Sequence, residues 1–220
     1  MSTKRGRAIN GDIFHVQHPT LALDVPFTTF IDVTYRGVTH QAFAAADRRA
    51  FSYATTTGEF SVAGLTGHIV ETLDNVETQA SHRYQALVAT EQGVLSVHSY
   101  DSVDALLSLV GALRPQETAL GIMVEPNDEI EFSSPPRVAM QTSIGILDIT
   151  PLTNQVLDEV PDWQGTSVVG GELFAGRFTD DAAYLTLVTN TCRAMVLPGS
   201  ASNDDQLATT VAELRVDWQA

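Results

Sequence analysis

The chain has very little of several residue types, and each shortage narrows what the protein can be. Cys192 is the only cysteine, so no disulfide can form within the chain. Lys4 is the only lysine, and 12 bases stand against 27 acids, which gives a formal net charge of −15. Because so acidic a surface repels nucleic acid, we expect no direct contact with nucleic acid.

Long apolar runs are also lacking. The stretch from Leu106 to Leu113 is interrupted by Ser108 and Gly111, and it is far shorter than the roughly 20 residues of a membrane span. The basic opening residues are not followed by an apolar segment, so the sequence predicts no export signal. We therefore expect a protein without a membrane span that stays in the cytoplasm or in a particle assembled there.

Motifs that carry chemistry are missing as well. The chain has no P-loop and no GxGxxG pattern, and the segment 165–170 lacks the spacing of GxSxG. Cys192 lies in an apolar segment, which favours a buried core thiol over a nucleophile. We expect no catalytic residues, no cofactor and no metal, so the prediction leans away from an enzyme.

Two sets of residues leave open the possibility that the protein is an enzyme. His15 and His18 are three residues apart, but Pro19 and the apolar residues before them favour a strand, on which they would lie on opposite faces. All six histidines precede residue 99, and the sequence leaves open whether they converge. Glu129 and Glu131 are expected to share a strand face, either as a cation or acid–base pair or, as we favour, as a solvated edge.

The segments that are present are mostly β-branched and alternate in polarity. The clearest hairpin is expected at 83–100, with its turn at Glu91–Gly93. Further strands are expected at 28–35, 60–62, 119–125, 138–142, 144–150, 171–178, 184–188 and 194–197. The segment 68–80 fits either a strand or a helix.

Apolar spacing predicts a few helices. One begins at Asp101 or Ser102 and ends before Pro115, with an apolar stripe that runs from Val103 to Leu113. A second is capped near Asn203, and its stripe is Leu207, Val211 and Leu214. Shorter helical pieces are expected at 43–51 and 154–160. Trp218 either seals the last helix against the sheet or anchors a partner, and we favour the place in the core.

Four blocks of the sequence recur in the same order, as in a duplicated domain. The pairs are 30–34 with 146–150, 61–64 with 167–170, 84–88 with 184–188, and 104–114 with 205–215. We predict an α+β, β-dominated fold of two tandem, duplicated units, each an antiparallel sheet followed by one amphipathic helix. The expected parts are a basic N-terminal arm at 1–12, a first unit at 13–134 and a second unit at 137–220, joined at Pro135 and Pro136.

The acidity, the repeat and the missing motifs together favour a non-enzymatic structural or assembly subunit, such as a ring or tube component of a virion or tail. Its expected partners are other copies of itself or neighbouring structural proteins. Lys4, Arg5 and Arg7 of the arm would dock on a neighbour's acidic surface. The alternative is a cytoplasmic small-ligand-binding or chaperone-like protein that uses the cleft between its two halves.

Overall fold

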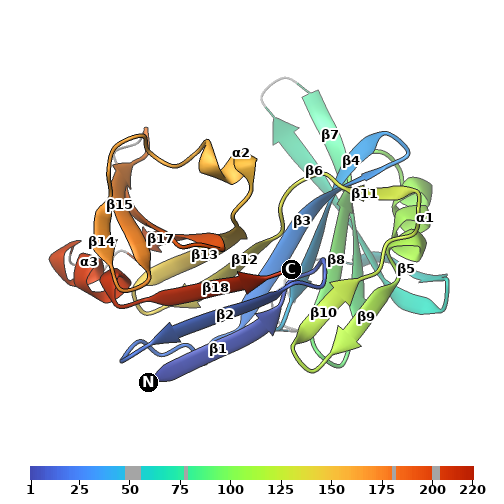
Figure 1. Cartoon of the computed structure of the whole chain (residues 1–220). Coiled ribbons are helices and arrows are strands. Elements are labelled where there is room, and N and C mark those ends of the chain that lie inside the picture. The colour runs from blue at the N-terminus through green and yellow to red at the C-terminus, as the bar shows by residue number, and fades with distance from the viewer. Residues whose placement is uncertain (48–55, 77–78, 180–181, 200–203) are drawn as a thin grey trace. The chain divides into compact units, whose positions relative to one another are not determined.

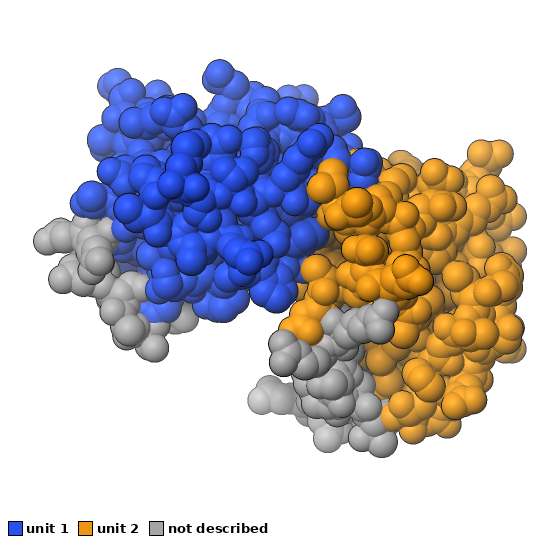
Figure 2. All heavy atoms as spheres, turned by 90° about the horizontal axis from the view of Figure 1, so that it is seen from below, with its two compact units in different colours: residues 1–7, 12–27, 137–220 blue, residues 8–11, 28–136 orange. Residues whose placement is uncertain are grey.

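Antiparallel β-structure dominates the chain, as expected (Figure 1). The computed structural model describes residues 1–47, 56–76, 79–179, 182–199 and 204–220. These form two compact units, which Figure 2 shows in blue and orange. Unit 1 comprises residues 1–7, 12–27 and 137–220, and unit 2 comprises 8–11 and 28–136. The units differ from the expected division in that 1–7 and 12–27 group with the C-terminal part.

Unit 1 holds two sheets. The larger has the strand order β14-β15-β16-β17-β13-β12, and the smaller has the order β1-β2-β18. The larger sheet is made of β12 (Arg137–Thr142), β13 (Gly145–Pro151), β14 (Thr166–Val168), β15 (Gly171–Arg177), β16 (Ala183–Val188) and β17 (Cys192–Pro198). The smaller is made of β1 (Ser2–Arg7), β2 (Ile13–His18) and β18 (Arg215–Gln219), and the helices of this unit are α2 (Asn154–Leu157) and α3 (Asp204–Ala212).

Unit 2 has a large sheet with the strand order β3-β4-β8-β7-β6-β5, to which β11 is added along β3, and a separate hairpin of β9 and β10. The large sheet is made of β3 (Phe27–Tyr35), β4 (Val38–Ala45), β5 (Thr56–Val62), β6 (Leu65–Val76), β7 (Gln79–Ala89) and β8 (Val94–Ser99). The remaining elements are α1 (Val103–Leu113), β9 (Pro115–Thr118), β10 (Gly121–Val124) and β11 (Ile130–Phe132).

The large sheets of the two units have the same strand order. Read from β3 the order is β3-β4-β8-β7-β6-β5, and read from β12 it is β12-β13-β17-β16-β15-β14. In both sheets the second strand along the chain therefore pairs with the sixth, and the fifth, fourth and third strands follow in that order. A helix and a further strand follow the last sheet strand: α1 and β9 in unit 2, α3 and β18 in unit 1. Three of the four sequence blocks fall on corresponding elements. The first does not, because 30–34 lies in β3, whereas 146–150 lies in β13, which corresponds to β4.

The core of unit 2 lies between α1 and the large sheet. Ser102 caps α1, since its hydroxyl accepts a hydrogen bond from the Ala105 amide at 3.2 Å. Leu106, Leu109 and Leu113 are fully buried on the face that packs against β5, β7 and β8. The helix ends at Leu113 and is capped by Arg114, whose φ of 46° is left-handed. The predicted boundaries of this helix are therefore confirmed.

Several segments differ from their expected structure. Residues 2–7, expected to belong to a basic arm, form β1 and pair with β2 along its whole length. Phe43 to Ala45 belong to β4 rather than to a helix, because β4 pairs on both sides, with β3 and β8, and this pairing overrides the helix propensity of alanine. The rest of that predicted helix, 48–51, and the predicted cap Asn203 lie outside the described residues.

Two further outcomes concern the C-terminal part. Trp218 belongs to the core, as we favoured, but it lies in β18 rather than beside the last helix. The stripe of Leu207, Val211 and Leu214 is buried as predicted.

Within the described part of the chain, no helix has the length and the apolar character needed to cross a bilayer.

Candidate functional site

The smaller sheet of unit 1 has one buried face and one outer face. On β1 the buried face carries Gly6, where a Cβ would lie 2.3 Å from Cζ of Phe14. Because side chains alternate along a strand, Ser2 and Lys4 lie on the same face as Gly6. The Lys4 Nζ accordingly stands 5.5 Å from the centre of the Phe27 ring. Of the three predicted arm residues, Lys4 therefore points inward.

The aromatic residues of this buried face hold the three strands together. Phe14 packs edge-on against Phe27, with ring centres 5.0 Å apart, and stacks on Trp218 at 6.4 Å. The indole Nε1 of Trp218 donates a hydrogen bond to Oδ2 of Asp12 at 2.9 Å, so the polar atom of this buried ring has a partner. The segment from Asp12 to Phe14 therefore fixes β18 next to β2.

The outer face carries the remaining side chains of the same strands. The pairing places them in rows across β1, β2 and β18. These rows are Thr3–Gln17–Arg215, Arg5–His15–Asp217 and Arg7–Ile13–Gln219, and together they define the outer face.

The outer face carries more positive than negative side chains, whereas the chain as a whole is negatively charged. It holds three arginines, Arg5, Arg7 and Arg215, and one carboxylate, that of Asp217. Asp217 is itself engaged, because it accepts hydrogen bonds from the Thr191 hydroxyl at 3.0 Å and from the Gln219 amide at 3.0 Å. Arg5 and Arg215 are exposed, and Arg7 is half-buried. A chain with a net charge of −15 thus presents a cationic sheet face.

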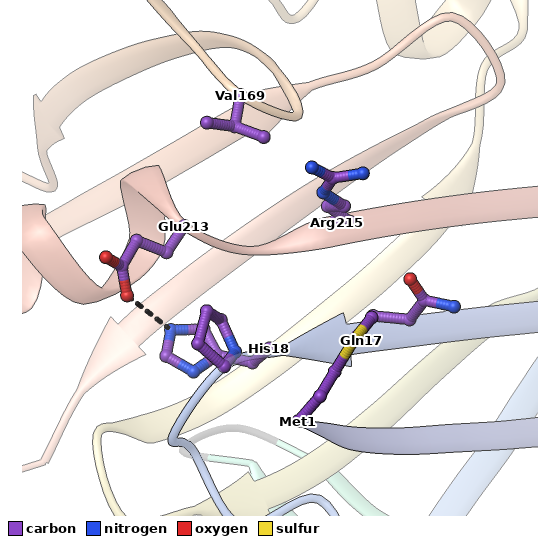
Figure 3. A pocket seen from close by; sticks show the side chains of 7 residues that line it. Met1, Gln17, His18, Val169, Glu213 and Arg215 are labelled. Atoms are coloured by element: carbon purple, nitrogen blue, oxygen red, sulfur yellow. Dashed lines mark ion pairs between the residues drawn. The ribbon is translucent and has the colours of Figure 1, made fainter.

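A pocket of about 480 Å³ opens where this face meets the end of β2. Figure 3 shows Gln17 and Arg215 on one side of it, and His18 directed toward Glu213 on the other. Val169, in the turn between β14 and β15, contributes an exposed apolar side chain to the pocket. The pocket thus combines an arginine and a carboxylate with one apolar wall.

His18 is a structural residue of this pocket. It is 1% exposed, and its Nδ1 accepts hydrogen bonds from the amides of Thr20 and Leu21 at 3.0 and 2.7 Å. The ring proton therefore resides on Nε2, which donates to the Thr210 carbonyl at 2.9 Å. The Glu213 carboxylate lies 4.0 Å from the same nitrogen. His18 ties the end of β2 to α3, with both ring nitrogens in use.

A second groove, of about 530 Å³, lies beside α3 in the same unit. Its walls are mostly apolar, with Leu185 and Leu207 among them, and Trp163 at its rim is 61% exposed. Among the described residues of its lining, Arg177 is the charged one. β14 begins at Thr166, which pairs with Leu173, so the part of β15 that lines the groove has no strand on that side within the described residues.

The histidines whose side chains the structure describes are not brought together as a metal site. His15 and His18 lie on opposite faces of β2, as expected for a strand. His40 is buried in β4, and burial lowers its pKa although Asp101 raises it in part. His98 packs against Phe43, with ring centres 4.8 Å apart. The side chain of His82 lies outside the described part, and in the described residues no group of three or more potential ligands is placed to hold a metal ion.

Glu129 and Glu131 occupy different elements. Glu129 lies in a turn, and its carboxylate is 3.4 Å from the Arg36 guanidinium. Glu131 lies on β11, opposite Thr34 of β3. The expected shared strand face is therefore wrong, because the strand begins only at Ile130.

Cys192 is fully buried at the start of β17. Burial raises the pKa of its thiol, while hydrogen bonds from Thr189 and Thr191 lower it in part. The side chain behaves as the core thiol that the sequence predicts.

Arg215 is the arginine of the outer face that the sequence analysis did not select as a candidate site residue. It precedes Val216 and Trp218, which alternate with polar residues as in a strand. That alternation was the available signal, whereas the pairing of Arg215 with Gln17 could not be predicted from the local pattern.

Comparison of the chain with protein-family models, with curated proteins and with solved structures finds no match.

Proposed function

We propose that this chain is a non-enzymatic assembly subunit that associates through the outer face of its β1-β2-β18 sheet. The observation that supports this most directly is the convergence of Arg5, Arg7 and Arg215 on one face of an otherwise acidic chain. Complementary charge speeds association and fixes the orientation of partners. Arg5 and Arg7 serve here from a strand rather than from a free arm.

The same proposal includes the duplication of the two units. Their common strand order, and the position of α1 and α3 after the last sheet strand, support it. Three of the four repeated sequence blocks support it as well. Ring and tube components, such as those of virions and tails, are the class of assembly that we propose for such a body.

The mass of the native particle tests this function. Light scattering is measured at one protein concentration over a series of salt concentrations. We expect a species larger than the monomer at low salt that dissociates as salt screens the arginines, since the screening length falls from about 30 Å at 0.01 M to about 10 Å at 0.1 M. A monomer at every salt concentration overturns the proposal.

The groove beside α3 favours a second candidate, a small-ligand-binding protein. An exposed tryptophan at the rim of an apolar groove, with an arginine in the lining, suits a ligand that is apolar at one end and anionic at the other. A series of fatty acids is the probe. Binding raises the melting temperature and changes the emission of Trp163, and Leu185→Asp abolishes both changes. No change in either with any chain length excludes this function.

A further inference from the structure

We propose that the outer face of one copy docks on an acidic turn of a second copy, so that copies join head to tail. We call acidic turn the segment from Glu125 to Glu131, which belongs to unit 2. This inference rests on the assembly function proposed above and names the surface that the arginines meet.

The acidic turn is the strongest concentration of negative charge along the chain. Its acids are Glu125, Asp128, Glu129 and Glu131, all exposed, and no other window of this length in the sequence has as many. Arg36 neutralises Glu129 in part, at 3.4 Å. In the described residues the other three carboxylates form no ion pair.

The turn is also held in one shape. The Asn127 amide donates to the Ala112 carbonyl at 3.1 Å, and the Ile130 amide donates back to Asn127 O at 3.1 Å. The Asn127 side chain accepts from the Glu129 amide at 3.1 Å. A fixed turn offers its carboxylates without a large cost in ordering on binding.

Charge decides the geometry of the contact. An isologous contact, outer face against outer face, would bring Arg5, Arg7 and Arg215 close to their own copies, and such juxtaposition of like charges is unfavourable. The acidic turn against itself meets the same objection. Outer face against acidic turn pairs opposite charges, and a contact between two different surfaces is heterologous, which generates rings or open filaments.

Charge reversal on each side tests this geometry in the full chain. Arg5→Glu removes one side of the contact and Glu131→Arg the other, and each is expected to weaken self-association by about tenfold or more. The matched controls are Arg137→Glu and Glu172→Arg, exposed positions of β12 and β15 with the same changes of charge. Both controls are expected to associate as the unaltered chain does.

Mixing the two reversed variants gives the decisive result. In a head-to-tail contact, the intact acidic turn of Arg5→Glu fits the intact outer face of Glu131→Arg, and the two reversed surfaces also attract. At a concentration at which each variant alone is monomeric, native mass spectrometry of the mixture is therefore expected to show complexes that contain both variants.

The outcomes separate this inference from the function on which it rests. If the unaltered chain associates and Arg5→Glu prevents it, but Glu131→Arg does not, the acidic turn is not the partner surface and the inference is overturned while the assembly function stands. If the unaltered chain is monomeric at every salt concentration, both are overturned. If the mixture contains only monomers, the head-to-tail geometry is overturned.

Discussion

Two buried side chains, those of His40 and Cys192, have no chemical role in the proposed function, and burial sets the direction of their pKa shifts. Nδ1 of His40 is buried without a hydrogen-bond partner among the described residues, and Cys192 is the buried first residue of β17, with a thiol whose pKa is raised. Both groups therefore favour their neutral forms in the folded chain.

Acid is expected to destabilise the protein through His40. Burial lowers the pKa of this histidine below its usual 6.5, so the unfolded chain binds a proton at a pH where the folded chain does not. The free energy of unfolding is therefore expected to fall as the pH drops below about 6.5, and the contribution is absent at higher pH. Urea unfolding from pH 7.5 to 5 measures it, and His40→Gln is expected to flatten the curve. Parallel curves for the two proteins contradict this assignment.

Cys192 is expected to be inert in the native protein. Its thiol is buried and its pKa is raised, so little thiolate is formed and no reagent reaches it. Ellman's reagent should give no colour with the folded chain and one equivalent after unfolding in urea, which serves as the control. Rapid reaction of the folded chain would show an accessible thiol.

At the scale of elements, the pattern of the sequence was most informative where contacts are local. The hairpin of β7 and β8 and the helix α1 lie where predicted. The residues that form the hairpin turn, the helix cap and the apolar stripe of the helix are close to one another in the sequence, so the local pattern identifies them. β1 pairs locally with β2, but its residues Ser2–Arg7 include no apolar side chain, so no alternation of polar and apolar residues marks it as a strand. β18 was missed because its order comes from pairing with β2, which joins residues about 200 positions apart, such as Gln17 and Arg215. The outer face could not be predicted for the same reason.

Corresponding leucines of α1 and α3 are expected to contribute similarly to stability. Leu106 and Leu207 are 0% and 4% exposed and hold equivalent places in the repeated block. Truncation of either to alanine is expected to lower the free energy of unfolding by about 2–5 kcal/mol. Ser108→Ala and Thr209→Ala, exposed on the same helices, are the matched controls and should change it by no more than about 0.5 kcal/mol. A cost for Leu106 alone would indicate that α3 is not packed as α1 is.

At the scale of the whole molecule, the distribution of charge is more informative than its total. The net charge of −15 describes solubility and repulsion, but it conceals a sheet face on which arginines outnumber carboxylates. The sequence analysis selected Arg5 and Arg7 as candidate docking residues and placed them on an arm together with Lys4. The strand separates them, because alternation turns Lys4 toward Phe27 and leaves the two arginines on the outer face.

The central claim is that this outer face carries the assembly of the protein. Sedimentation velocity at low salt, on the unaltered chain and on Arg5→Glu/Arg215→Glu at equal concentrations, tests it most directly. We expect the unaltered chain to sediment as a species whose size grows with concentration, and the double variant to sediment as a folded monomer with an unchanged circular dichroism spectrum. Equal sedimentation of the two proteins, whether both assemble or both are monomeric, would contradict the claim.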